Sequence, residues 1–275
     1  MKNFLTIIYV YYNTPKEILD SVDSLMTACI KNKYEIIIIN NNSPKPLPAF
    51  ARKHNITILD NKKNYGYGKA VNQGAKIANG KLLLVVNPDT IFQNYAIDLM
   101  VEKMNSDKKI GVLGPQLIDA HGKVLHSISS MPNLPDILFA LSYINKIWPN
   151  NSYSRKYWAL GIDRNREFES ETVGGAVMLI RKNVFKKIEG FDERFFLYFE
   201  EADLCKRVTK AEYRVLYYPK AKVVHLVGKS TKDKKFIKQN YEKSRFLFLK
   251  KYYGFIPAIL TETFLRLPTY IARKK

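Results

Sequence analysis

Short apolar runs alternate with helix-like patterns from residue 5 to residue 117 of the chain. The runs that predict strands are Leu5–Tyr12, Glu35–Ile39, Asn55–Leu59, Lys81–Val86 and Ile110–Leu117. The segments with apolar residues at helical spacing are Lys16–Lys31, Gly68–Ala78 and Ala96–Asn105. Alternation of this kind predicts an α/β fold whose central sheet is mainly parallel and Rossmann-like, with helices on both faces.

The second half of the chain is less regular. Residues 131–169 have few clear periods and several prolines and tryptophans, which indicates a long connection or lid of the kind that often binds substrate. After it we expect strands at Thr172–Arg181, Tyr213–Tyr218 and Val223–His225, and helices at Glu200–Lys210, Phe236–Tyr252 and Ile256–Tyr270.

Polar clusters follow three of the predicted strands. They are Tyr12-Asn13, Asn40–Ser43 and Asn87-Pro88-Asp89. Each cluster alone is typical of an ordinary turn. Because ligands of open α/β sheets bind at the carboxyl ends of strands, their joint placement instead indicates a binding site, in which Asp89 can hold a divalent metal.

Glycines punctuate the start of the second predicted helix, in Asn64-Tyr65-Gly66-Tyr67-Gly68-Lys69-Ala70-Val71-Asn72. Glycine lets a ligand approach a helix N-terminus, where phosphate binds well. The spacing is not that of a dinucleotide fingerprint or a phosphate loop. A glycine-assisted helix start without a ligand remains the alternative.

The densest cluster of candidate chemistry is Glu200, Glu201 and Asp203, which follow a mostly aromatic stretch. Mutual repulsion and loss of solvation raise the pKa of such carboxyls and suit one of them to act as a base. The alternative is a solvated helix start with acids that complement the helix dipole. His225, after an apolar strand, gains interest as a metal ligand because Asp89 already suggests such a site.

Taken in order, these motifs resemble the family 2 inverting glycosyltransferases with the GT-A fold, and more narrowly their bacterial rhamnosyltransferase branch. The resemblance covers residues 4–230. The motifs that carry it are Val10–Asn13, Asn40–Ser43, Asn64–Gly74, Asn87–Asp89, Gly174–Ala176, Gly190–Arg207 and His225.

The resemblance implies a role for each of these positions. Contacts to the nucleotide base and the nucleotide-sugar are implied for Val10, Tyr12, Asn13, Asn40, Asn64, Gly68, Asn72, Asn87, Gly174 and Gly175. Asp89, with His225 as a second ligand, would hold Mg²⁺ or Mn²⁺. Glu201 would be the general base, with Glu200 and Asp203 positioning the site.

The chain departs from the family pattern at three places. Asn40 and Asn87 stand where relatives often have aspartate, and Glu200-Glu201 replaces a Glu-Asp pair. The nucleotide loses a charged contact and the metal an anionic ligand, and either glutamate remains a candidate for the base.

The expected reaction transfers L-rhamnose from dTDP-L-rhamnose to a hydroxyl of a lipid-linked or oligosaccharide acceptor in cell-surface polysaccharide synthesis. A UDP-hexose donor is the alternative within the family. A single displacement assisted by one base would invert the anomeric centre, and no covalent enzyme intermediate would form.

The charge is concentrated toward the C-terminus. Residues 206–275 hold 19 basic and four acidic residues, which is +15 of the total formal charge of +20. A further helical extension, residues 231–275, would follow a transferase domain over residues 1–230. Its apolar positions Ile256, Ile259, Leu260 and Phe264 share a helical face that would either enter an anionic membrane surface or pack on the core.

Two other classes of protein compete with the transferase. The net charge and the aromatics of the C-terminal region suggest a nucleic-acid-binding protein, but the motifs of such proteins are missing and we expect no nucleic-acid partner. The three departures suggest a non-catalytic glycan-binding protein, against which Asp89, Asp203 and His225 argue. Without a run of about 20 apolar residues, no membrane span is expected. Two distant cysteines, Cys29 and Cys205, are interpreted as core residues of a cytoplasmic protein, peripheral at most on the inner face of the membrane.

Overall fold

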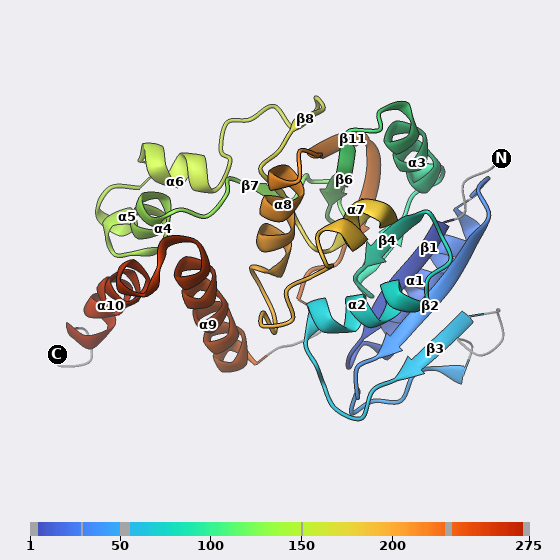
Figure 1. The fold of residues 1–275 in the computed structure, drawn as a ribbon, viewed down its shortest axis with the longest axis horizontal. Helices are drawn as coiled ribbons and strands as arrows, with labels where there is room; N and C mark the ends of the chain where they lie inside the picture. Colours follow the sequence, from blue (N-terminus) through green and yellow to red (C-terminus); the bar gives the residue numbers. More distant parts are fainter. Residues whose placement is uncertain (1–4, 29, 50–55, 150, 229–232, 272–275) are drawn as a thin grey trace.

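The computed structural model describes residues 5–28, 30–49, 56–149, 151–228 and 233–271 (Figure 1). The strands are β1 (Leu5–Tyr11), β2 (Tyr34–Asn40), β3 (Ile56–Asp60), β4 (Leu82–Val86), β5 (Thr90–Phe92), β6 (Ile110–Ile118), β7 (Ile128–Ser129), β8 (Phe168–Glu169), β9 (Thr172–Val173), β10 (Val177–Arg181) and β11 (Arg214–His225). The helices are α1 (Pro15–Thr27), α2 (Tyr67–Ile77), α3 (Ala96–Ser106), α4 (Leu134–Leu141), α5 (Ile144–Ile147), α6 (Ser152–Tyr157), α7 (Lys182–Lys187), α8 (Glu200–Lys210), α9 (Lys234–Tyr253) and α10 (Phe255–Ile271).

The main sheet is mixed and mostly parallel in its N-terminal half. Its strand order is β3-β2-β1-β4-β10-β6-β11-β5, and β8 pairs with β11. The β3-β2-β1-β4 pairs are parallel, whereas β10 runs antiparallel to both β4 and β6. The predicted α/β architecture with a mainly parallel central sheet is confirmed.

Alternate residues of β1 face opposite sides of this sheet. Ile7 packs with one apolar cluster, which includes residues of α1 and α3. Ile8 packs with the other, which includes residues of α2, α7 and α8. Helices therefore cover both faces, as expected for a strand that is buried along its whole length. Cys205 is fully buried in the second cluster, as predicted, and Cys29 lies outside the described residues.

Chain connections reverse direction beside β1. The first connection leads from β1 outward to β2, and the later connection from β3 through α2 crosses back to β4 on the other side of β1. Such a reversal opens a crevice at the carboxyl ends of the strands. Two of the predicted polar clusters, after β1 and after β4, flank this point.

The strand prediction was wrong for Thr172–Arg181. The segment breaks at Gly174 into β9, which pairs with β7 in a separate small sheet, and β10, which joins the main sheet. Gly174 donates its N–H to the Ser127 carbonyl (2.8 Å), so the chain leaves one sheet before it enters the other. The structure also has one strand, β11, where two strands were predicted at Tyr213–Tyr218 and Val223–His225. The pairing of β11 with β6 shifts its register between Tyr218 and Lys222, and the strand continues across the shift.

The C-terminal helices pack on the rest of the molecule through α9. Phe248 of α9 lies in an apolar cluster with Phe195, Phe199 and Ala202 around the start of α8. α10 packs against α9 and α4 at one end of the molecule (Figure 1). In the part of the chain that the structure describes, no helix is long and apolar enough to cross a membrane.

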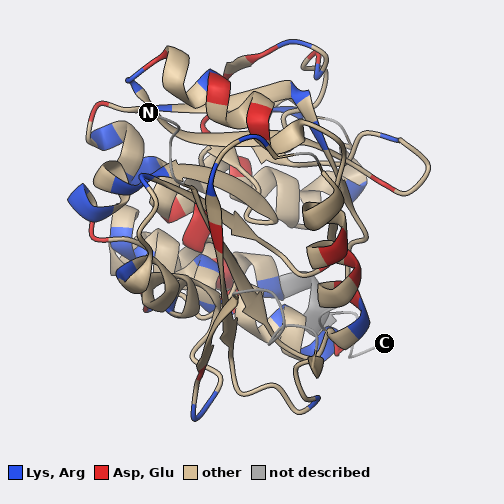
Figure 2. Cartoon of the chain, turned by 90° about the vertical axis from the view of Figure 1, so that its right-hand side faces the viewer, with Lys and Arg blue, Asp and Glu red and all other residues tan. Residues whose placement is uncertain are grey.

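Basic residues are not confined to one stripe. Figure 2 shows lysine and arginine on several elements of the face that carries the N-terminal half, with acidic residues among them.

Candidate active site

A cavity of about 460 Å³ lies at the point where the sheet connections reverse, and we call it the switch-point cavity. Its walls come from the ends of β1, β4 and β11, the loop before α2, the loop before α8 and the first turn of α9. The lining residues are Val10, Tyr12, Asn41, Asn64, Gly66, Tyr67, Asn87, Pro88, Asp89, Phe196, Leu197, Tyr198, His225, Val227, Gly228, Phe236 and Ile237.

Asp89 is the buried acid of this cavity. It is 3% exposed, and its Oδ1 atom accepts no hydrogen bond. His225 Nε2 lies 3.2 Å from that oxygen, because β5 pairs with β11 and the Leu226 N–H donates to the Asp89 carbonyl (2.9 Å). The imidazole is thus the neighbouring polar group of this oxygen, and a buried carboxylate without a well-formed hydrogen bond there favours a further ligand.

These two side chains fit a divalent cation. Carboxylate oxygen and imidazole nitrogen are both ligands of Mn²⁺, and Mg²⁺ is often held by one or two carboxylates and substrate phosphates. Among the described residues, no group of three histidine, cysteine or acidic side chains could hold a metal alone. The remaining ligands would therefore have to come from water or from a bound phosphate-containing molecule.

An amide network shapes the wall beneath the cavity. Asn41 Nδ2 donates to Asn64 Oδ1 (2.9 Å) and to the Gly66 carbonyl (3.1 Å), and Asn64 Oδ1 also accepts the Gly66 N–H (2.9 Å). Gly66 has φ +84°, and a Cβ there would lie 2.4 Å from the Phe196 carbonyl oxygen. The glycine thus lets the loop before α2 pass directly beneath the loop before α8.

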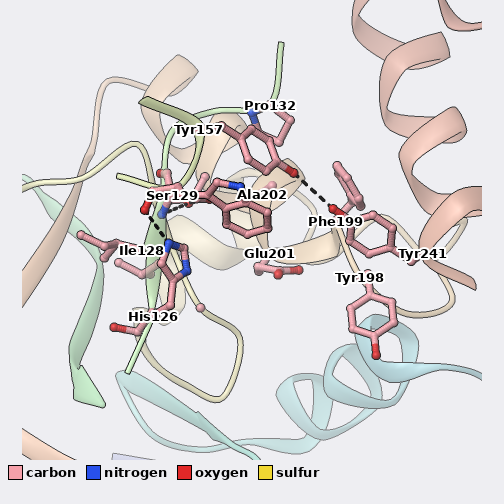
Figure 3. Close-up of a pocket in the computed structure, with 15 residues that line it drawn as sticks. His126, Ile128, Ser129, Pro132, Tyr157, Tyr198, Phe199, Glu201, Ala202 and Tyr241 are labelled. Atoms are coloured by element: carbon pink, nitrogen blue, oxygen red, sulfur yellow. Dashed lines mark hydrogen bonds between the residues drawn. The ribbon is translucent and has the colours of Figure 1, made fainter. Parts of the chain in front are cut away.

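A second cavity of about 220 Å³ lies beside the start of α8, and we call it the α8 cavity (Figure 3). It is lined mostly by aromatic and small side chains: His126, Ser127, Ile128, Ser129, Pro132, Tyr157, Trp158, Thr172, Val173, Gly174, Tyr198, Phe199, Glu201, Ala202 and Tyr241. Tyr198 lines both cavities, so the two spaces adjoin at its side chain.

Glu201 is the carboxylate that faces the α8 cavity. Its Oε2 atom has no hydrogen-bond partner, and burial raises the pKa of its carboxyl. Glu200 is 5% exposed and lines neither cavity. Burial first, and then the charge of Glu201, raise its pKa well above the ordinary range. Of the two glutamates, Glu201 is therefore the one that a bound molecule can reach.

Tyr67 lies near the carboxylates of Glu200, Glu201 and Asp89. Its hydroxyl donates to the Gly175 carbonyl (2.8 Å), and its ring lines the switch-point cavity. Burial raises its pKa well above the ordinary value, and the charges of Glu200, Glu201 and Asp89 raise it further. The Tyr67 hydroxyl thus stays protonated between the acids of α8 and the candidate metal ligand.

The backbone before α8 is strained. Tyr198 and Phe199 have φ values of +70° and +65°, a region that residues with a Cβ rarely adopt. Two such residues in succession cost free energy, and strain of this kind persists where the surroundings hold it, often at functional sites. This turn places Tyr198 between the cavities and directs the first turn of α8 toward them.

The structure brings most of the predicted site residues to one of these cavities. Val10, Tyr12, Asn64, Asn87, Asp89 and His225 line the switch-point cavity, and Gly174 and Glu201 line the α8 cavity. Gly175 lies close to both, because a Cβ on it would be 3.8 Å from Glu201 Cβ and 3.9 Å from the Tyr67 ring.

Two predicted asparagines lie beside the switch-point cavity instead of lining it. Asn40 Nδ2 donates to Asp60 (2.8 Å), and its Oδ1 accepts the Ser43 N–H (3.1 Å). Asn13 donates its backbone N–H to Ser43 Oγ (2.9 Å). Both residues order the loop after β2, and the neighbouring Asn41 provides the cavity wall.

Gly68 and Asn72 serve the packing of α2. A Cβ on Gly68 would lie 2.9 Å from Phe191 Cβ, so the glycine allows a close approach of protein and not of a ligand. Asn72 Nδ2 donates to the Phe191 carbonyl and its Oδ1 accepts the Phe191 N–H, both at 2.9 Å. Neither residue lines the switch-point cavity, contrary to the expectation from sequence.

Asp203 faces away from both cavities. It is fully buried, and its oxygens accept hydrogen bonds from Arg207 Nε (2.8 Å), Tyr252 Oη (2.7 Å) and Lys251 Nζ. A carboxylate with these cationic and hydroxyl partners is not available as a base. Asp203 instead ties α8 to α9.

Sequence reasoning missed several lining residues. Asn41 was hidden in the Asn40–Ser43 cluster, and Tyr67 lay inside the glycine-rich motif with no signal of its own. The aromatic residues that come from separate helices, such as Trp158 and Tyr241, carry no pattern that links them. One prediction pointed toward this wall, namely that residues 131–169 form a substrate-binding connection or lid. That segment contains α6, which provides Tyr157, and the next residue, Trp158.

Comparisons with known proteins agree with this arrangement. The family described as Glycosyl transferase family 2 matches residues 6–188, and the one described as N-terminal domain of galactosyltransferase matches residues 153–229. The chain is 28% identical over 264 residues to the N-acetylglucosaminyl-diphospho-decaprenol L-rhamnosyltransferase of Mycobacterium tuberculosis, covering 90% of this chain and 85% of that protein. It is 26% identical to the rhamnosyltransferase WbbL of Escherichia coli, covering 64% of this chain and 60% of that protein.

Solved structures share the fold at lower identity. A mannosyltransferase from Pyrobaculum calidifontis in complex with GDP-Man and Mn²⁺ has a TM-score of 0.62 and 14% identity, covering 97% of this chain and 71% of that one. Staphylococcus aureus TarS in complex with UDP has a TM-score of 0.57 and 16% identity, covering 90% and 64%. These neighbours confirm the GT-A-like architecture.

Proposed function

The chain belongs to glycosyltransferase family 2, and on this premise we propose that it transfers L-rhamnose from dTDP-L-rhamnose to a hydroxyl of a lipid-linked or oligosaccharide acceptor. The observation that carries the proposal is the meeting of two cavities at Tyr198, one with the buried Asp89 beside His225 and the other with an accessible glutamate. The names of the two rhamnosyltransferase relatives support the choice of sugar.

The switch-point cavity is the proposed donor site. Val10, Tyr12, Asn64 and Asn87 would contact the nucleotide-sugar along its walls. Asp89 and His225 would hold Mn²⁺ or Mg²⁺, and a cation bound there would offset the negative charge of the departing diphosphate.

Glu201 is the proposed general base. As the acceptor oxygen forms a bond to the anomeric carbon, the bond to the diphosphate oxygen breaks and the diphosphate leaves with the electron pair. Glu201 takes the proton of the acceptor hydroxyl, and attack from the face opposite the leaving group inverts the anomeric centre. Its raised pKa suits this role, because a stronger base accepts the proton more readily.

The α8 cavity is the proposed acceptor site. Trp158, Tyr157 and Tyr241 offer apolar ring surface, and Ser127 Oγ is buried there without a hydrogen-bond partner. Apolar walls with a few directed polar groups are typical of sites for small ligands. A sugar ring, with one apolar face and several hydroxyls, has matching chemistry.

The domain division proposed from sequence, residues 1–230 and 231–275, needs one qualification. Phe236 and Ile237 of α9 line the proposed donor site, so the C-terminal extension contributes part of the wall of a site formed mainly by residues 1–230.

A donor panel tests the proposal. Purified protein is mixed with dTDP-rhamnose, UDP-glucose, UDP-N-acetylglucosamine or GDP-mannose, with and without Mn²⁺, while thermal stability and nucleotide release are followed. We expect metal-dependent stabilisation and slow hydrolysis with dTDP-rhamnose. A response to a UDP-sugar alone would refute dTDP-rhamnose as the donor but leave the chain a sugar transferase. No response to any donor would contradict the whole proposal.

A further inference from the structure

The outer face of α10 is apolar and exposed, apart from an edge contact between the Phe255 ring and the Phe246 ring of α9. Phe255, Ile256, Ile259, Leu260 and Phe264 are 54%, 68%, 44%, 64% and 40% exposed. They recur at a spacing that places them on one side of a helix. We call this set the α10 face.

The inner face of the same helix carries both apolar and polar residues. Thr261 and Glu262 are 4% and 5% exposed, and Ala258 is fully buried beside them. Arg245 of α9 donates two hydrogen bonds to Glu262, at 2.6 and 2.8 Å, and both side chains are buried. The helix is thus held to α9 and α4 by apolar contacts and one buried ion pair, while its large apolar side chains lie on the exposed side. A contiguous set of large apolar residues that stays exposed indicates a partner for that side.

Basic side chains border part of the α10 face. Lys250 Nζ lies 5.7 Å from the centre of the Phe255 ring. Lys243 and Arg266 line the groove between α9 and α10 together with Ile259, and Arg266 lies 3.6 Å from Glu242 in the same groove. Over its whole length, α9 contains six lysines and one arginine against one glutamate. Apolar residues beside lysines match the surface of a lipid bilayer with anionic headgroups, which has an apolar acyl layer beneath its negative charge.

A second element at this end of the molecule is also apolar and exposed. The short helix α5 and its C-cap expose Ile147 (72%) and Trp148 (57%), and Lys146 precedes them. Figure 1 shows α5, α4 and α10 together at the end farthest from the N-terminal strands. Tryptophan beside lysine is typical of residues at a membrane interface.

We propose that the α10 face docks on the surface of an anionic lipid bilayer, with its apolar residues in the interface and the lysines of α9 at the headgroups. Buried apolar area and attraction to anionic lipid act together in such binding. The sequence left open whether this face enters a membrane or packs on the core. In the structure the face is exposed, and α10 packs on α9 and α4 through its other side. The proposal does not depend on the identity of the sugar donor.

Cosedimentation of the full chain with lipid vesicles tests it. The vesicles are phosphatidylcholine mixed with phosphatidylglycerol, compared with phosphatidylcholine alone. The variant Ile256→Asp/Leu260→Asp is compared with Ile77→Asp/Ile162→Asp, which makes the same charge change at residues that are 42% and 43% exposed elsewhere. Circular dichroism and donor-dependent thermal stabilisation check that both variants keep the fold.

We expect the wild-type protein and the Ile77/Ile162 variant to bind the anionic vesicles, with binding weakened by salt, and the Ile256/Leu260 variant to bind about tenfold less. Equal binding by the two variants, or no binding by the wild type, would overturn the proposal. Loss of a dimer in the Ile256/Leu260 variant, without vesicle binding by the wild type, would instead assign the α10 face to self-association.

Discussion

Replacement of Glu201 by glutamine is the most direct test of the catalytic assignment. Glutamine keeps the shape of the side chain and removes its ability to take a proton. A positioned general base contributes typically about 10²–10⁴-fold to the rate, which corresponds to about 2.7–5.4 kcal/mol of transition-state stabilisation. Because Glu201 lines the α8 cavity and has an unpaired oxygen, we expect the full effect in kcat and little change in donor affinity.

The matched control is Glu200→Gln. Glu200 adjoins Glu201 in sequence, but it is buried and lines neither cavity, so its side chain cannot reach an acceptor. We expect Glu200→Gln to retain most of its turnover. The assay measures initial rates of sugar transfer at saturating donor, with donor binding followed separately by thermal shift.

The pH dependence gives a second measurement on the same residue. A base must be deprotonated to act, and burial raises the pKa of Glu201, so kcat should fall on acidification at a pH above the ordinary range for glutamate. The Glu201→Gln variant should lack this acidic limb. Turnover of Glu201→Gln within about threefold of the wild type, or an equal loss in Glu200→Gln, would refute the assignment of the base.

Three further predictions concern stability. Gly66→Ala should lower the free energy of urea unfolding more than Gly122→Ala does. Both glycines have φ above +80°, where a residue with a Cβ costs about 1–2 kcal/mol. Only at Gly66 would the added Cβ also collide with backbone, that of Phe196. Arg245→Met or Glu262→Met alone should cost about 3–5 kcal/mol, whereas the double variant should unfold near the wild-type midpoint, since a buried charge is costly when unpaired. Glu200→Gln should raise the free energy of unfolding at neutral pH and leave it unchanged at acidic pH. The raised pKa of Glu200 means that ionisation of this buried carboxyl costs the native state stability as pH rises, and glutamine does not ionise.

The sequence predicted those parts of the fold that depend on local patterns. The strand Leu5–Tyr12 and the helix Glu200–Lys210 agree with β1 and α8 to within a residue, because apolar runs and helical spacing act over short distances. The break at Gly174 depended on a distant partner, the carbonyl of Ser127, and no local pattern records such a pairing.

The candidate site divides in the same way. Asp89 directly precedes β5 and His225 ends β11, and the pairing of these two strands brings the side chains together. The strand β5 was not predicted, so the sequence linked Asp89 and His225 only through the chemistry of a metal site. Gly68 was assigned to a ligand because a glycine signals close approach without identifying what approaches, and here it is the Phe191 side chain. The aromatic wall of the α8 cavity required the tertiary positions of α6, α8 and α9 together.

The position of the proposed base depends on contacts on both sides of α8. On one side, the left-handed backbone at Tyr198 and Phe199 starts the helix beside the two cavities. On the other side, Asp203 bonds to Lys251 and Tyr252 of α9, and Phe248 packs against Phe199. The strain before α8 persists because α9 holds the helix from behind, and the same α9 carries α10 with its apolar outer face. The proposed base at Glu201 and the proposed docking face of α10 are thus connected through one helix, α9, which contacts both α8 and α10.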